Sequence, residues 1–73
     1  MYELLRARIT EKGLSTNSVA LKCGINPAVM YMAYKGKGYI FPAYRKRLAA
    51  FLEIDEQELF KDADEDERRK END

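Results

Sequence analysis

The sequence predicts a single all-α domain of five short helices. Apolar residues recur at helical spacing, as in Leu5 and Ile9, and no stretch shows the apolar–polar alternation of a β-strand. Capping residues and prolines mark the starts of the helices, and glycines mark their ends. A chain of 73 residues is too short for two hydrophobic cores, so we expect one compact domain over residues 1–60.

The first two predicted helices each end at a glycine. Helix 2–12 stops before Gly13, because a residue without a Cβ readily adopts the left-handed conformation that closes a helix. Ser15 is a good N-cap for a second helix over 16–23, since its hydroxyl can accept from an amide of the next turn. Gly24 closes that helix and allows a sharp turn.

The other three helices are predicted from their start signals. Asn26 followed by a proline combines an N-cap with the residue favoured at the first helical position, and predicts a helix over 27–35. Another proline opens a helix over 42–52. Asp55, with a glutamate three residues later, predicts a short fifth helix that completes the domain.

Residues 61–73 differ from the rest of the chain in composition. They contain no apolar side chain larger than alanine, so we expect a frayed helix end and then a disordered acidic tail. Charge is divided in the same way: residues 1–52 hold nine Lys/Arg and two Asp/Glu, a net +7, while residues 53–73 hold four and eleven, a net −7. A basic body with an acidic end is often linked to nucleic-acid binding. The tail either solubilises the protein or screens the basic body.

The composition argues against an enzyme, a metalloprotein and a membrane protein. The chain has no histidine, and Cys23 is its only cysteine, so the commonest general base and the usual zinc-binding clusters are missing. We interpret Cys23 as a small buried apolar residue. Because no stretch has the pattern of a signal peptide or a membrane span, we expect a cytoplasmic protein without a cofactor.

The segment 15–35 places two short helices on either side of a glycine turn at 24–26. Ala20 is small enough to let the two helices approach closely, and Ile25 fills the space between them. With the stretches around it, this pattern resembles the phage repressor and Cro-like (lambda repressor-like) helix-turn-helix domains over residues 3–60. The matching stretches are LRARITEKGLS, VALKCGIN, KG (35–36) and LAAFLEIDEQELF.

The resemblance implies a DNA-binding transcriptional regulator of the repressor type, from a phage or mobile element, that binds double-stranded DNA as a homodimer. The helix 27–35 would enter the major groove. Its base-contacting positions would be Pro27, Ala28, Val29, Tyr31 and Met32. We expect phosphate contacts from the second helix, the end of the third helix and the fourth helix, at Thr16, Asn17, Lys35, Lys37, Arg45, Lys46 and Arg47. At the C-terminal helix, Leu59 and Phe60 either cover the base of the core or form the homodimer contact; the core is favoured for Leu59, and both alternatives stay open for Phe60.

Two features set this chain apart from the usual family pattern. Many members pair an arginine on the first helix with a glutamate on the third helix, and Ile9 and Tyr34 stand at those positions here. Among the expected base-contacting residues, only Tyr31 has a polar group on its side chain. Discrimination between base pairs by hydrogen bonding is therefore expected to be weak.

The apolar front of the third helix also suits a different function. A helix-turn-helix fold can serve as a protein–protein interaction module, of the anti-repressor or antitoxin-like kind. Four aromatic residues lie on the third helix and in the segment after it. We expect Tyr34 and Phe41 in the core. Tyr31 and Tyr39 are open to two interpretations: they could pack on sugar–phosphate or enter a DNA groove, or form an exposed aromatic patch that suits a protein partner.

Overall fold

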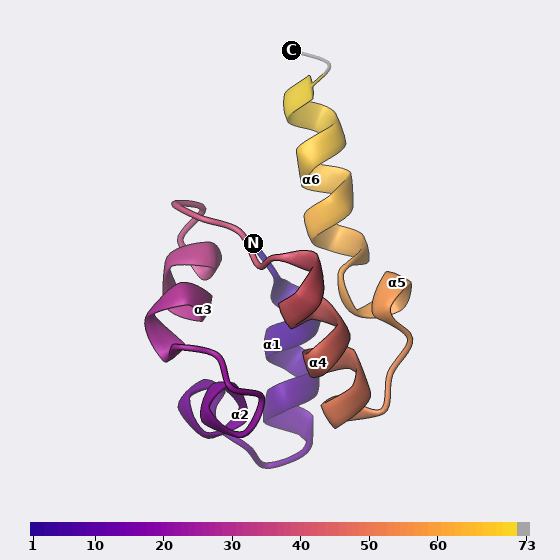
Figure 1. The fold of residues 1–73 in the computed structure, drawn as a ribbon. Coiled ribbons are helices and arrows are strands. Elements are labelled where there is room, and N and C mark those ends of the chain that lie inside the picture. The colour runs from indigo at the N-terminus through magenta and orange to yellow at the C-terminus, as the bar shows by residue number, and fades with distance from the viewer. Residues whose placement is uncertain (72–73) are drawn as a thin grey trace.

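The chain folds into helices joined by short turns (Figure 1). The computed structural model describes the backbone of residues 1–71 and the side chains of residues 1–67. Within that part of the chain there are six helices and no strand, so the all-α prediction is confirmed. The helices are α1 (Glu3–Glu11), α2 (Thr16–Lys22), α3 (Pro27–Tyr34), α4 (Pro42–Leu52), α5 (Glu56–Leu59) and α6 (Lys61–Glu71).

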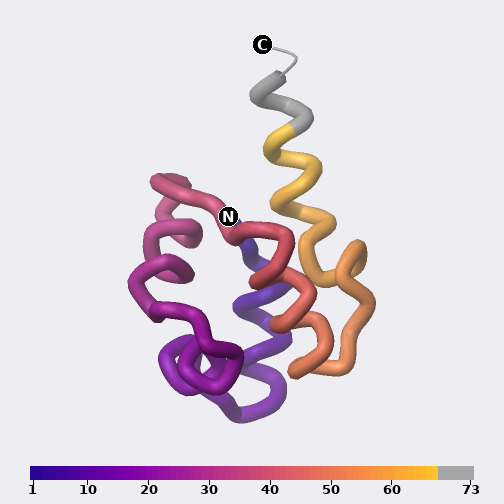
Figure 2. The backbone as a smooth tube through the Cα atoms, viewed as in Figure 1, coloured from indigo at the N-terminus to yellow at the C-terminus, as the bar shows by residue number. Residues whose placement is uncertain are grey.

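The helices form a compact body from which α6 extends. Helix α2 packs on α3 and on α1, and α6 packs on α1 and α5. The radius of gyration over Cα atoms is 11.7 Å, close to the roughly 11 Å expected of a compact domain of this length. The tube in Figure 2 shows the N-terminus beside the segment that joins α3 to α4. None of the described helices combines the length and apolar character needed to cross a membrane.

The predicted caps form as hydrogen bonds at the starts of α2 and α3. The Ser15 hydroxyl oxygen accepts from the Ser18 amide at 3.1 Å, and the Asn26 side-chain oxygen accepts from the Ala28 amide at 3.0 Å. Between the two helices, Gly24 has a φ of 70°, a conformation that is costly for residues with a Cβ. The turn leaves Ile25 buried beneath the helix pair. These local interactions fix where α2 ends and α3 begins.

The core gathers apolar side chains from every helix. Tyr2 is buried, and its hydroxyl accepts from the Ile40 amide at 3.2 Å. Its ring meets the Phe60 ring edge-on, with centroids 6.1 Å apart. Tyr2 near the start of the chain therefore contacts both Phe60, near the end of the predicted domain, and the segment before α4. Cys23, expected to be buried, is only half-buried against this core.

The prediction of a frayed helix end and a disordered tail after residue 60 differs from the structure, which has a further helix, α6, in this segment. The chain stays helical from Lys61 to Glu71, while residues 72–73 lie outside the described part. Three contacts hold the first turn: Ala63 is buried, Asp62 Oδ2 accepts from the Leu4 amide at 3.3 Å, and Asp64 pairs with Arg45. The prediction of disorder considered only large apolar side chains. It missed these contacts because they are made by two carboxylates and one alanine.

Of the two alternatives for Leu59 and Phe60, the structure shows the core of a single chain and not an exposed dimer contact. Leu59 and Phe60 are 1% and 0% exposed. Neither side chain is available to a second copy while α6 packs in this position. A homodimer of this fold would have to use another surface.

Candidate nucleic-acid interface

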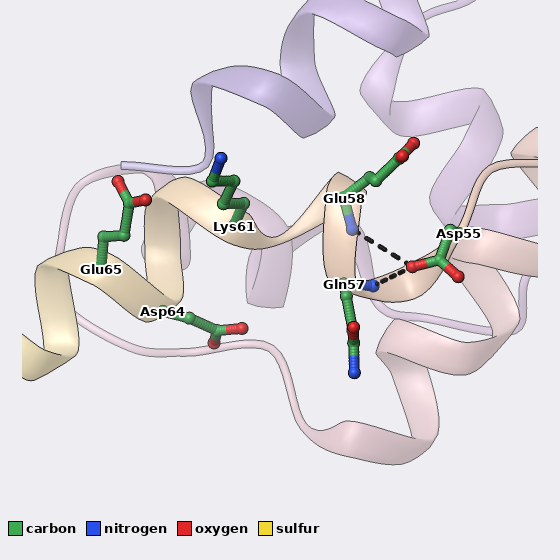
Figure 3. Close-up of a pocket in the computed structure, with 6 residues that line it drawn as sticks. All are labelled: Asp55, Gln57, Glu58, Lys61, Asp64 and Glu65. Carbon is green, nitrogen blue, oxygen red and sulfur yellow. Dashed lines mark hydrogen bonds between the residues drawn. The ribbon is translucent and has the colours of Figure 1, made fainter.

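Basic and acidic side chains lie in different parts of the chain. Between Glu11 and Glu53 the sequence has no Asp or Glu, and this stretch contains the whole of α2, α3 and α4. The acidic side chains gather instead around α5 and the start of α6. Figure 3 shows four of them, with Lys61 and Gln57, around an open groove: Asp55, Glu58, Asp64 and Glu65. The three helices α2, α3 and α4 therefore contribute no carboxylate to the surface.

Helix α3 presents part of its predicted base-contacting set to solvent. Ala28, Tyr31 and Met32 are exposed, the latter two at 45% and 44%. Pro27 and Val29 are half-buried, and Val29 packs against the core. The exposed face is therefore narrower than expected, because α3 uses one of its front positions to pack on the body.

The two polar residues predicted at the start of α2 differ in their surroundings. Thr16 is half-buried, and its hydroxyl shares a hydrogen bond of 3.0 Å with the Tyr34 hydroxyl. Asn17 is exposed. The Thr16–Tyr34 bond ties the first turn of α2 to the last turn of α3. Thr16 therefore also helps to set how the two helices lie against each other.

Four of the predicted phosphate-contacting cations are exposed. Lys35 and Lys37 follow α3, and Lys46 and Arg47 lie on α4. None of these four forms an ion pair with any described carboxylate. Arg47 also bridges α4 to the turn before α3, because its Nη1 donates to the Cys23 carbonyl at 3.4 Å. Its guanidinium lies 5.6 Å from the Tyr44 ring centroid, which limits its freedom while leaving it exposed.

Arg45 does not have the free side chain that phosphate contact requires, so this prediction is corrected. Its Nη1 pairs with Asp64 at 2.8 Å, its Nε donates to the Ile40 carbonyl at 3.2 Å, and its side chain is 13% exposed. Its guanidinium also lies 4.8 Å from the Phe60 ring centroid. Burial lowers the pKa of Arg45, but the hydrogen bond and charge of Asp64 outweigh burial and raise it. Arg45 thus stays charged and fastens α6 to α4.

Phe41 also differs from the prediction. It was expected in the core, and its side chain is 50% exposed. It precedes a proline, which favours an extended backbone, and its φ and ψ are −61° and 151°. Ile40 is fully buried, whereas Tyr39 and Phe41 on either side of it are about half-exposed. Their rings touch edge-on, with centroids 4.9 Å apart.

The structure adds one cation that the sequence interpretation missed. Arg6 on α1 is exposed, and its guanidinium lies 5.1 Å from the Tyr34 ring centroid. Burial raises the pKa of the Tyr34 hydroxyl above its ordinary value, so the ring remains neutral. Helical spacing could have indicated Arg6. The lambda repressor-like pattern has an arginine at the position of Ile9, and Arg6 lies one helical turn before Ile9 on the same side of the helix.

In comparisons with protein-family models, curated proteins and solved structures, none matches this chain. Within the described residues, no three His, Cys, Asp or Glu side chains are grouped so that they could hold a metal ion.

Proposed function

We propose that the protein binds double-stranded DNA, with α2 and α3 acting as a helix-turn-helix and α3 entering the major groove. One observation carries the proposal: the exposed face of α3 belongs to a stretch of chain that has no acidic residue and that holds the four exposed cations predicted to contact phosphates. These cations are Lys35, Lys37, Lys46 and Arg47. Phosphates attract such a surface whatever the base sequence, and phosphate contacts supply most of the affinity of non-specific binding.

The exposed side chains of α3 favour weak discrimination between base sequences. Ala28 and Met32 are apolar and can contact the methyl group of thymine, while Tyr31 offers one hydroxyl. None of the three can make a bidentate hydrogen-bond pair with a base. We therefore propose a regulator of the lambda repressor-like type whose affinity comes mainly from phosphates, with shape and apolar contacts adding preference.

The proposal is tested by fluorescence anisotropy with a random-sequence duplex over a series of salt concentrations. Four exposed cations at about 0.9 counterions each give an expected slope of about −3 to −4 for log K against log salt. Lack of binding at about 50 mM salt, where several phosphate contacts have a large effect, would contradict the proposal.

A second candidate function rests on the exposed large apolar residues. Tyr31 and Met32 on α3 and the Tyr39–Phe41 pair are all close to half-exposed. Large apolar side chains gathered on one part of a surface favour a protein partner. If DNA binding fails, the fold is better explained as a protein–protein interaction module. Substitution of Tyr39 and Phe41 by serine would then abolish partner binding while leaving the fold intact, because neither ring is buried.

A further inference from the structure

A groove lies between α1, the start of α2 and the end of α3. Its volume is about 450 Å³, and no acidic side chain lines it. Two cations are among its lining residues, Arg6 on α1 and Lys35 just after α3. Within residues 1–67, neither cation is paired with a carboxylate. Three helices thus contribute to a concave site whose charge is wholly positive.

The hydroxyl groups of the groove provide hydrogen-bond donors beside the cations. Thr16 and Tyr34 share one hydrogen bond of 3.0 Å, in which only one of the two hydroxyls donates. The proton of the other hydroxyl remains available to a ligand. Ser15 also lines the groove, and its oxygen accepts from the Ser18 amide, which leaves the Ser15 proton able to donate as well. Cations and hydroxyl donors together match the acceptor oxygens of a phosphate.

Arg6 is held in place by stacking. Its guanidinium lies 5.1 Å from the Tyr34 ring centroid, a distance at which a cation and a ring attract each other. Stacking restricts the side chain without using its hydrogen-bond donors, because the ring face accepts the cation as a whole. The guanidinium is therefore positioned before any ligand arrives, which lowers the entropy cost of binding.

We propose that this groove binds a phosphate group, with Arg6 and Lys35 as its charged ligands, and that its occupant is a backbone phosphodiester of bound DNA. Tyr31 lines the groove and also belongs to the exposed face of α3, so the groove borders the surface that faces the DNA. This inference rests on the proposed function, and it adds α1 to the helices that contact DNA. Arg6 is the residue by which it is tested.

The test compares Arg6→Gln with Arg8→Gln in the salt-dependent anisotropy assay. Arg8 is an apt control because it is an exposed arginine of the same helix, already paired with Glu11 at 2.9 Å and absent from the groove. Loss of one phosphate contact is expected to reduce the slope of log K against log salt by about 0.9 for Arg6→Gln and to leave it unchanged for Arg8→Gln. A full wild-type slope in Arg6→Gln would overturn the inference.

A second measurement separates failure of this site from failure of DNA binding. Inorganic phosphate is titrated into isotope-labelled protein, and the amide signals of Thr16 and Lys35 are followed by NMR. If the wild type binds no DNA, the proposed function fails. Shifts at these two amides that disappear in Arg6→Gln would then support a site for free phosphate, and absence of shifts would overturn the site itself.

Discussion

Replacing Lys35, Lys37 and Lys46 together by glutamine is expected to weaken binding to random-sequence duplex DNA by roughly two to three powers of ten at 0.1 M salt. Each phosphate contact releases about 0.9 counterions, which is worth about 0.9 log units between 1 M and 0.1 M salt. All three lysines are exposed and unpaired with any described carboxylate. The fold should be unaffected, because none of the three side chains is buried.

A matched variant changes the net charge equally at three cations that lie beside carboxylates. Arg8, Lys12 and Lys61 line surface grooves that also contain carboxylates, among them Glu58. Their replacement by glutamine is expected to leave the salt slope near the wild-type value. Equal losses in the two triple variants would mean that total charge, and not the surface around α3, determines DNA affinity.

Phe60→Ala is expected to reduce the free energy of unfolding by about 3–5 kcal/mol, as is usual when a fully buried phenylalanine is truncated. Phe60 is 0% exposed, meets the Tyr2 ring edge-on at 6.1 Å, and lies beneath the Arg45 guanidinium. Truncation of this one ring, just before α6, therefore removes its contacts with Tyr2 at the start of the chain and with Arg45 on α4. A small domain has about 5–15 kcal/mol of total stability, so the variant should be at the edge of unfolding.

Urea denaturation followed by circular dichroism measures this loss, with Phe51→Ala as the control. Phe51 is 37% exposed on α4, so its truncation removes fewer contacts and is expected to cost clearly less than that of Phe60. Equal costs at the two positions would contradict the burial of Phe60. A stable Phe60→Ala variant with a changed oligomeric state would instead restore Phe60 as a dimer contact.

The sequence predicted the helices well where their signals are local. Ser15 and Asn26 cap the helices that they were expected to cap, and Asp55 accepts from the Gln57 and Glu58 amides at 2.9 and 3.4 Å. The predicted helix over 42–52 has the bounds of α4. Caps, prolines and glycines act within one helical turn. The interacting groups are therefore close together in the sequence and can be recognised from it.

The sequence predicted the site less well where long-range contacts decide. Arg45 and Lys46 are neighbours with the same charge, yet one is partly buried and paired with Asp64 on α6, and the other is exposed. The difference depends on Asp64, nineteen residues further along the chain, whose helix was itself expected to be disordered. Arg6 was missed for the same reason, because its position above the Tyr34 ring exists only once α1 and α3 are packed.

Titration of isotope-labelled protein with a random-sequence duplex, followed by NMR, maps the surface that contacts DNA. We predict that the largest amide shifts fall in three places: residues 15–17, residues 27–38 and the cationic side of α4 near Arg47. We also predict that α5 and α6 stay unchanged, because their carboxylates repel phosphates. Large shifts on α5 and α6 with none on α3 would contradict the assignment of α2 and α3 as the DNA-binding helices.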